Sequence, residues 1–511
     1  MGIVAKQTLS NSIIIFIGAL LGAINLMLLY PIILPDEEIG LTRLLITFTI
    51  LLSQLASLGG GTMLIKFIPI NNDGKGGYNG VASFIFLVGI IGFLIVLLSL
   101  IFGKPIFEFL YSDNSKLFIE YFNFLIPLIF FQILINYFNG ILHANFQSVF
   151  PQFINEILLK ILTTIILIIY SFELIAFYEF MIFFVFSYVI ASVVLFFQIA
   201  KQNKFSFRLK FNDLNKRSIL KYGFANTLTS LASNLTNRID VVMIGSLLGG
   251  VIVFGDIKDF NVGLYYVTIY TIASYMATLL EMPARALANI ASTVISKAWN
   301  DNDMNLISDL YKKSSINQLV IGLLIFLGIW VNIDDLLIIT GKDYSAGKWV
   351  FLFLALGKII NIASGVNGKI IILSKYYLFG TYFTFLLAII TFFSNLFFIP
   401  YFESLPNNIG IEGAALATAL SVFLFNFVSF IFLFIKYKLQ PFSLNTILIL
   451  GVAVSTLLIV DIFSFEFVNY LQIFAKSLIV SLIFIPAAYF LKVSSDFNRI
   501  IEKFFRLFIH K

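Results

Sequence analysis

Long apolar runs dominate this 511-residue chain and limit what it can fold into. A helix of about 20 apolar residues is the length that crosses the hydrocarbon core of a bilayer. Fourteen such runs recur, with approximate bounds 9–33, 41–65, 79–103, 118–142, 152–172, 175–199, 222–247, 263–288, 316–340, 347–373, 376–399, 411–435, 445–463 and 470–491. A soluble domain with 60% apolar residues would expose large apolar patches. We therefore predict an all-α polytopic membrane protein with about 14 transmembrane helices.

The positions of Lys and Arg give an orientation, because cytoplasmic loops are enriched in these residues. With the N-terminus inside, cytoplasmic segments and helix ends hold 23 of the 33 basic residues. Five more lie within spans, and the outer loops hold five, namely Lys104, Lys116, Lys258, Lys342 and Lys348. We predict that both termini are cytoplasmic. The net charge of +6 is spread over many short loops, which argues against nucleic-acid binding.

Several classes of chemistry are excluded by composition. The chain has no cysteine and only two histidines, His143 and His510, so we expect no disulfide, no metal centre and no cofactor. The Gly-rich segment "NNDGKGGYNG" (71–80) lacks the Gly-Lys-Ser/Thr ending of a phosphate loop. The predicted outer loops are short, and none contains histidine or a dense acidic cluster. We predict a transporter rather than an enzyme.

Two short matches indicate an internal repeat. "EIGLTRLLITF" (38–48) parallels "NVGLYYVTIYT" (261–271), and "NYFNGILHA" (136–144) parallels "SGVNGKIII" (364–372). The offsets, 223 residues from Gly40 to Gly263 and 228 from Gly140 to Gly368, are nearly equal. We predict a six-helix lobe at 1–200, a basic cytoplasmic linker at 201–221 and a second six-helix lobe at 222–437. Residues 438–511 form a terminal helix pair and a basic cytoplasmic tail.

Three segments carry a resemblance to a known family: "NRIDVVMIGSLLGG" (237–250), the "NVGLYY" that follows it, and "LASLGGGTMLIKFI" (55–68). With the two-lobe architecture, they resemble the polysaccharide-unit flippase branch of the multidrug/oligosaccharidyl-lipid/polysaccharide exporter superfamily. The resemblance covers essentially the whole chain. It implies translocation of polyprenyl-diphosphate-linked oligosaccharides across the bacterial cytoplasmic (inner) membrane, for polysaccharide or O-antigen export. Two lobes would alternate access around a cationic cleft, with H⁺ or Na⁺ as coupling ion and other polysaccharide assembly proteins as further partners.

Charged residues inside the spans are the first candidates for the site, because a charge at the bilayer centre must face protein or water. The cations are Arg43, Lys160, Arg238 and Lys358, and we expect them to line a cleft for an anionic headgroup. Each has a structural alternative. Arg43 could extend to the outer headgroups, and Lys160 could pair with Glu156 one turn earlier. Lys358 has no acidic residue at pairing distance along its own helix, which favours a functional role.

Acidic and amide residues complete the prediction. Arg238 and Asp240 point about 200° apart on one helix, so we expect them to serve different surfaces. Asp240 and Glu281 are candidates for ion coupling or for fixed counter-ions, and Glu281 could also pair with Arg285. Amide side chains at inner helix ends, Asn139, Asn361 and Asn367, could hydrogen-bond sugar hydroxyls or join helices.

Two other functions remain open at this stage. The first is an ion-coupled multidrug or cation exporter of the same superfamily, against which stand the fourteen spans and the cationic rather than acidic set of buried charges. The second is a membrane glycan polymerase, ligase or glycosyltransferase. Such enzymes need a sizeable outer loop or domain for their chemistry, and the predicted loops are too short for one.

Overall fold

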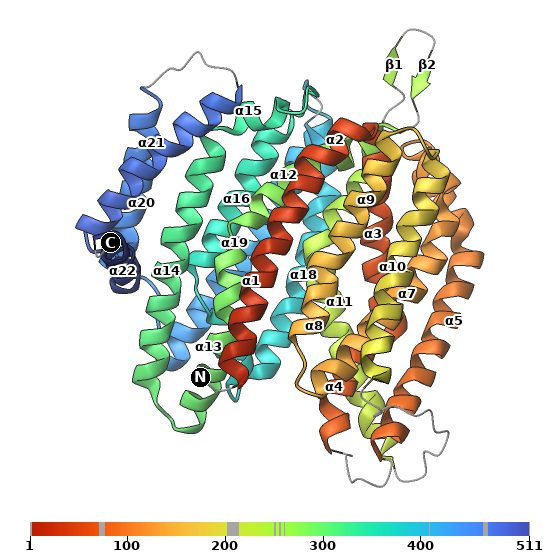
Figure 1. The fold of residues 1–511 in the computed structure, drawn as a ribbon, viewed down its shortest axis with the longest axis horizontal. Helices are drawn as coiled ribbons and strands as arrows, with labels where there is room; N and C mark the ends of the chain where they lie inside the picture. Colours follow the sequence, from red (N-terminus) through yellow and green to blue (C-terminus); the bar gives the residue numbers. More distant parts are fainter. Residues whose placement is uncertain are drawn as a thin grey trace. The chain divides into compact units, whose positions relative to one another are not determined.

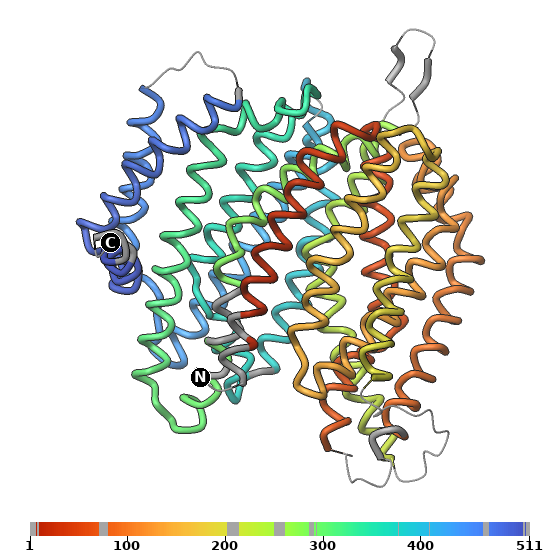
Figure 2. Tube along the Cα trace, viewed as in Figure 1, coloured from red at the N-terminus to blue at the C-terminus, as the bar shows by residue number. Residues whose placement is uncertain are grey.

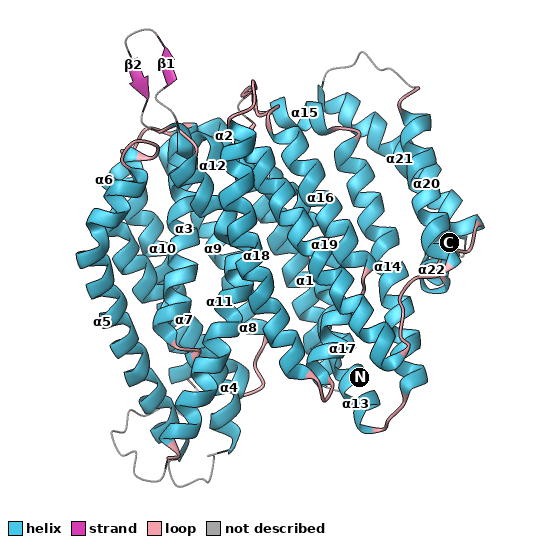
Figure 3. Cartoon of the chain, turned by 180° about the vertical axis from the view of Figure 1, so that it is seen from behind, coloured by secondary structure: helices cyan, strands magenta, loops and turns pink. Residues whose placement is uncertain are grey.

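The computed structural model describes residues 3–70, 77–201, 214–249, 252–254, 257–259, 261–407, 409–462 and 469–509. These residues are almost entirely helical (Figure 3). One antiparallel hairpin, in which Val253 pairs with Lys258, is an exception. The chain divides into two compact units, Met1–Thr271 (unit 1) and Ile272–Lys511 (unit 2). The predicted all-helical class is confirmed.

Long helices make up most of unit 1, which is shown from red to green along the chain (Figure 1). In chain order they are α1 (Ile3–Ala23), η1 (Ile24–Leu29), α2 (Tyr30–Ile33), α3 (Asp36–Ser57), α4 (Gly60–Ile70), α5 (Gly77–Tyr111), α6 (Lys116–Glu120), η2 (Phe122–Phe124), α7 (Leu125–Ala144), α8 (Val149–Phe153), η3 (Ile154–Leu158), α9 (Leu159–Ser171), α10 (Phe177–Ala200), α11 (Lys216–Leu247), β1 (Ile252–Phe254) and β2 (Ile257–Asp259). The next helix, α12 (Val262–Leu279), crosses the boundary between the units.

Among its described residues, unit 2 consists of helices joined by loops. Its elements are α13 (Met282–Asn300), α14 (Met304–Trp330), α15 (Ile333–Ile338), α16 (Gly347–Ala363), α17 (Asn367–Leu373), α18 (Tyr377–Glu403), α19 (Gly410–Tyr437), α20 (Leu444–Val460), α21 (Asn469–Phe490) and α22 (Ser495–Ile509). Figure 2 traces the same path as a tube. Helices α16 and α18 pack on α19, and α14 packs on α13, α16, α20 and α21. Buried residues such as Ile295, Tyr311, Ile370 and Leu433 form one apolar cluster in this unit.

Glycine sets how closely the helices of unit 1 approach. Helix α3 starts with three acidic residues, which favour the positive end of its dipole. It ends where Leu58 and Gly59 adopt positive φ, so that the chain turns into α4. A Cβ on Gly140 of α7 would lie 2.7 Å from the backbone of Gly61 in α4. The two backbones can therefore touch only because both residues are glycine.

Eleven helices are long and apolar enough to cross a membrane, or twelve if the bent pair α16–α17 counts as one span. This makes the chain a multi-pass membrane protein. Each of the eleven overlaps a predicted run, and the bent pair overlaps the run 347–373. The two remaining predicted runs correspond to α11, which carries many polar residues, and to α20, which has only 17 residues.

Three predicted spans are wrong in detail. The run 316–340 is misplaced, because α14 begins at Met304 and ends at Trp330, and the separate helix α15 follows it. The run 263–288 is two helices, because α12 ends at Leu279 and α13 begins at Met282. Pro283 stands in the first turn of α13, where its missing N–H breaks no intrahelical bond. The run 347–373 bends by 52° between α16 and α17, at Gly365, whose φ is +56°. Mean hydropathy alone does not detect such breaks, because each run stays apolar on average across its break.

The predicted lobes 1–200 and 222–437 remain a prediction, since compact packing units need not follow a sequence repeat. Most of the predicted basic linker, residues 202–213, lies outside the described residues, as do the last two residues of the predicted tail. The terminal helix pair α20–α21 packs on α14. It is also held by an ion pair of 3.2 Å between Lys476 and Asp335.

Candidate functional site

The guanidinium of Arg43 on α3 lies over an aromatic ring, and its extension to the headgroups stays a prediction. Its guanidinium carbon is 4.5 Å from the centroid of the Tyr30 ring, and Tyr30 is fully buried. A cation over a ring face is stabilised by the quadrupole of the ring, more so where water is excluded. The Nε–H of Arg43 is buried, and within the described part of the chain it has no hydrogen-bond partner. A buried donor of this kind is available to an anionic ligand.

Arg238 of α11 interacts electrostatically with the same buried tyrosine, Tyr188, as Arg43 does. Both Arg43 and Arg238 lie close enough to the buried hydroxyl of Tyr188 on α10 to act on it electrostatically, as does Tyr30. Two of the four predicted cations therefore converge within unit 1. We call Tyr30, Arg43, Tyr188 and Arg238 the basic–tyrosine site. Two planar guanidinium groups beside phenolic hydroxyls can bind phosphate oxygens in a forked geometry.

Asp240 has a different neighbour. It is buried, and its carboxylate accepts a hydrogen bond from the hydroxyl of Tyr270 on α12. The neighbours of Arg238 and Asp240 thus lie on different helices, α10 and α12. That the two charges serve different surfaces stays a prediction. A carboxylate held by a buried tyrosine can act as a counter-ion or accept a proton.

Lys160 forms the structural pair that its spacing from Glu156 indicates. Its Nζ lies 3.0 Å from the Glu156 carboxylate and donates to the carbonyl of Gly18 at 2.8 Å. The carbonyl of Lys160 in turn accepts from the Asn25 amide at 3.0 Å. These contacts join the first span to α9 and its neighbouring turn η3. The predicted ion pair is confirmed, while contact between Lys160 and a substrate stays a prediction.

In unit 2, Glu281 is the centre of a second polar group. It stands at the break between α12 and α13, where it is almost fully buried. Its carboxylate lies 3.1 Å from Nζ of Lys358 on α16 and 3.8 Å from the guanidinium of Arg285. The pair with Arg285 follows the predicted spacing. The pair with Lys358 joins residues 77 positions apart, so it could not be seen along one helix.

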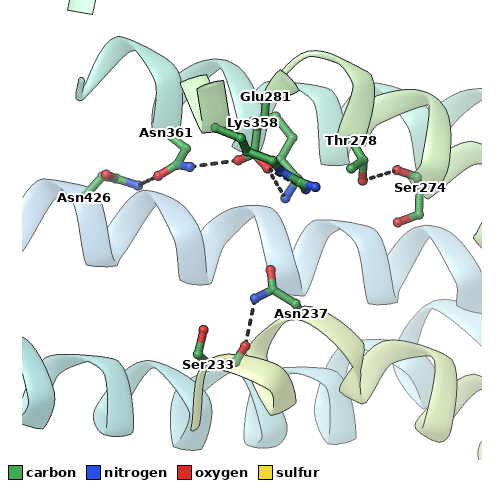
Figure 4. Close-up of polar contacts among 9 residues, drawn as sticks. Ser233, Asn237, Ser274, Thr278, Glu281, Lys358, Asn361 and Asn426 are labelled. Carbon is green, nitrogen blue, oxygen red and sulfur yellow. Dashed lines mark hydrogen bonds and ion pairs between the residues drawn. The ribbon is translucent and has the colours of Figure 1, made fainter. Parts of the chain in front are cut away.

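Amide side chains extend this group to α17 and α19, and Figure 4 shows the contacts that join Glu281, Asn361 and Asn426. Asn361 of α16 donates to Glu281 at 2.8 Å, and Asn426 of α19 donates to Asn361 at 3.3 Å. Asn367 of α17 donates to Asn426 at 2.9 Å. We call Glu281, Lys358, Asn361, Asn367 and Asn426 the carboxylate–amide chain. It joins helices, as expected by default for amides in a membrane bundle.

A cavity of about 310 Å³ lies beside this chain in unit 2. Its polar lining includes Glu281, Arg285, Gln318, Asn361, Asn367 and Lys369. The side chain of Arg285 is more than half exposed, whereas Lys358 is only 20% exposed and is held by Glu281. A polar ligand in this cavity could therefore be bound by Arg285 and by amides.

The sequence of the chain assigns it to a known family. A family model described as "Polysaccharide biosynthesis protein" matches residues 4–295. The chain belongs to this family. The matched range contains the whole basic–tyrosine site together with Glu281, whereas Lys358, Asn361 and Asn426 lie beyond it. No curated protein sequence matches the chain significantly.

Solved structures of membrane transporters share the fold of this family member. "Lipid II flippase MurJ, inward closed conformation" aligns with a TM-score of 0.72 and 16% identity, covering 94% of this chain and 98% of that one. An outward-facing multidrug resistance MATE family transporter of the MOP superfamily aligns with a TM-score of 0.57 and 18% identity, covering 84% and 95%. These proteins are named as flippases and transporters, which agrees with the expectation that the chain is not an enzyme. The likeness to the predicted superfamily is confirmed at the level of fold.

Some residues of these sites were missed by the sequence prediction. Tyr30, Tyr188 and Asn426 are absent from the predicted set, because one tyrosine or asparagine among many in an apolar run carries no distinguishing signal. Asn139, which was predicted, is not part of either group; its buried carbonyl oxygen has no hydrogen-bond partner among the described residues. Contact between Asn139 and a sugar hydroxyl of the substrate remains a prediction.

Proposed function

We propose that this protein is a flippase for polyprenyl-diphosphate-linked oligosaccharide units, acting in the bacterial cytoplasmic membrane for polysaccharide or O-antigen export. Its membership in the polysaccharide biosynthesis family supports this function, and the flippase fold at a TM-score of 0.72 is compatible with it. The observation that carries the proposal is Arg43, which lies 4.5 Å from the centroid of the buried Tyr30 ring and has a buried N–H without a hydrogen-bond partner in the described chain. A diphosphate is the part of such a substrate that two guanidinium groups bind best.

Arg43 differs from the two lysines of the spans in what it can offer a ligand. Lys160 and Lys358 already have carboxylate partners at 3.0 and 3.1 Å. Arg43 instead presents a buried N–H that lacks a hydrogen-bond partner in the described chain. In the proposal, Arg43 and Arg238 bind the diphosphate, while Asn361, Asn367 and the cavity beside them contact sugar hydroxyls. Asp240 is the candidate for coupling transport to H⁺ or Na⁺, and Glu281, which is paired with Lys358, acts as a fixed counter-ion.

The transport cycle follows from the two-lobe architecture. The lobes 1–200 and 222–437 would expose the headgroup site first to the cytoplasm and then to the outer face, while the lipid tail stays in the bilayer. Fourteen crossings with both termini cytoplasmic fit this scheme. They would comprise the eleven candidate spans, the bent pair α16–α17, the polar helix α11 and the short helix α20.

A flipping assay tests the proposal. The protein is reconstituted in liposomes with a short fluorescent polyprenyl-diphosphate oligosaccharide, and a membrane-impermeant quencher reports which leaflet holds the label. A polyprenol that carries the same glycan without phosphate is the matched control. We expect rapid loss of protected label for the diphosphate and slow loss for the control. Equal rates for both lipids would contradict a diphosphate site.

A second candidate function is export of small cations or drugs, because a MATE transporter shares the fold. The same liposomes, loaded with a fluorescent cationic dye and given a proton or Na⁺ gradient, separate the two functions. Dye export without lipid flipping would establish the exporter and end the flippase proposal. Lipid flipping without dye export is the result we expect.

A further inference from the structure

Helix α22, at the C-terminal end of the chain, differs in pattern from the membrane-spanning helices. Its sequence is "SDFNRIIEKFFRLFI", in which apolar residues recur at positions 497, 500, 501, 504, 505 and 508. This spacing of three and four puts them on one side of a helix. Asn498, Arg499, Glu502, Lys503 and Arg506 fall on the other side. The segment is therefore a strongly amphipathic helix.

The helix is too short and too polar to cross a bilayer. Fifteen residues at about 1.5 Å each span roughly 22 Å, less than the roughly 30 Å of a hydrocarbon core. The lipid-facing helix α18, by contrast, has 27 residues and exposes apolar side chains such as Phe393 and Phe397 at 62% and 64%. Helix α22 presents charged residues along its whole polar face. A helix of this kind lies along the surface of a membrane.

Contacts hold the start of α22 against the rest of unit 2. Asn317 of α14 donates to Asp496 at 2.9 Å. Asn498 donates to the carbonyl of Tyr489, at the end of α21, also at 2.9 Å. The backbone N–H of Phe497 donates to Ser494, which caps this first turn. Figures 1 and 3 both show α22 next to the ends of α20 and α21. Its position is thereby fixed at one end of the terminal helix pair.

Beyond this first turn, both faces of the helix reach the surface of unit 2. Ile500, on the apolar side, is 65% exposed. Arg499, Lys503 and Arg506 are exposed on the polar side, where Glu502 is the exposed acidic residue, and Asp496 already accepts the bond from Asn317. Three cations against one free carboxylate give this face a positive charge. Anionic headgroups complement such a face, and acyl chains complement the apolar one.

We propose that α22 lies in the headgroup region of an anionic lipid leaflet. Its apolar side, which includes Ile500, enters the boundary with the acyl chains, and Arg499, Lys503 and Arg506 bind lipid phosphates. The bilayer is the occupant that fits both faces at once, because a second protein surface would have to match the apolar stripe and the cations separately. In this position α22 fastens the terminal helix pair and, through Asn317, helix α14 to the membrane surface.

The absence of cysteine makes a direct test practical, because a single introduced cysteine is the only labelling site. Spin labels are placed in turn at positions 499, 500, 501, 502 and 503 of the full-length protein. The protein is reconstituted in vesicles of phosphatidylglycerol and phosphatidylcholine, and collision rates with oxygen and with a water-soluble nickel chelate are measured. Phe393→Cys on α18 serves as the lipid reference, and Asp301→Cys, in the exposed turn before α14, serves as the aqueous reference.

We expect the ratio of oxygen to nickel collisions to be several-fold higher for Ile500→Cys than for Glu502→Cys. It should vary along the five positions with the helical period. Water-like ratios at all five positions would overturn the proposal. Low collision rates with both reagents at position 500, together with dipolar broadening between labels, would also overturn it, because they indicate a second copy of the chain on this face.

The role of charge is tested separately. In the Ile500→Cys background, Lys503→Gln with Arg506→Gln removes two of the cations without changing the apolar side. We expect the label to become several-fold less immersed in vesicles containing phosphatidylglycerol and to change little in pure phosphatidylcholine. A matched pair of surface lysines in unit 1, Lys104→Gln with Lys116→Gln, should have no effect. Unchanged immersion in the Lys503→Gln/Arg506→Gln variant in both vesicle types would overturn the assignment of anionic lipid.

Discussion

In unit 1 the guanidinium of Arg43 rests on the ring of Tyr30, whereas in unit 2 Lys358 lies 3.1 Å from the carboxylate of Glu281. Both residues are cations in apolar runs, and the sequence alone does not distinguish their roles. The difference lies in their partners, because an aromatic ring stabilises a cation without neutralising it. A carboxylate neutralises its partner and reduces its attraction for an anionic ligand. The comparison teaches that a charge in a span is a binding candidate only after its tertiary partners are known.

A second comparison concerns the glycines of the internal repeat. Gly140 and Gly368 occupy matching positions in "NYFNGILHA" and "SGVNGKIII". A Cβ on Gly140 would meet the backbone of Gly61 at 2.7 Å, whereas a Cβ on Gly368 would meet nothing within 4 Å. The same residue is thus a packing requirement in unit 1 and has open space around it in unit 2.

The largest expected effect comes from breaking the pair in unit 2. Lys358→Met leaves the buried carboxylate of Glu281 without its main partner, so we expect the free energy of unfolding to fall by about 3 kcal/mol. The double variant Lys358→Met/Glu281→Gln removes both charges and should recover most of that loss. Thermal unfolding of the purified proteins in detergent measures both. A single variant as stable as the wild type would show that Lys358 does not support Glu281.

Changing the arginine of unit 1 should affect transport rather than stability. Arg43→Gln removes a charged donor to the proposed diphosphate, a contact worth about 1.5–3 kcal/mol. We expect the flipping rate in liposomes to fall by roughly ten- to hundredfold with little change in the unfolding temperature. The control Lys104→Gln removes an exposed cation and should flip lipid at the wild-type rate. A fall in stability without a specific fall in flipping would make Arg43 a structural residue.

Alanine at the two repeat glycines sharpens the second comparison. Gly140→Ala forces α7 away from α4 and should cost about 1–3 kcal/mol of stability, the usual range for overpacking. Gly368→Ala, the matched control, should change stability by less than about 0.5 kcal/mol. The unfolding temperatures of the two variants, each compared with the wild type, measure these losses of stability. Equal losses would mean that the close approach of α7 to α4 does not limit this position.

The smallest expected effect lies in the amide chain of unit 2. Asn426→Ala removes the residue between Asn361 and Asn367, which leaves one hydrogen bond unmade on each side. We expect a loss of about 1–2 kcal/mol in the free energy of unfolding. Asn226→Ala on α11 is a control for the loss of an amide side chain, because Asn226 donates to the carbonyl of Tyr222 on its own helix. A fall in flipping that exceeds the fall in stability would add sugar contact to the role of Asn426.

Much of the fold was predictable from particular sequence features. The apolar runs located every candidate span, and the spacing of Lys160 from Glu156 and of Arg285 from Glu281 identified two ion pairs correctly. The break between α12 and α13 and the pair of Glu281 with Lys358 were not predicted in this way. Both depend on which helices become neighbours, and a single sequence does not contain that information in its local periodicity. For the same reason Tyr188 could not be distinguished from the other tyrosines as the meeting point of two arginines.

The most direct test of the account compares two charge-removing variants in the flipping assay, with rates normalised to folded protein. Arg43→Gln removes a cation that rests on an aromatic ring, and Lys358→Met/Glu281→Gln removes a cation together with its counter-ion. The account predicts that flipping of the polyprenyl-diphosphate oligosaccharide collapses in Arg43→Gln and largely survives in the double variant. Survival in Arg43→Gln and collapse in the double variant would contradict it, and would move the headgroup site to unit 2.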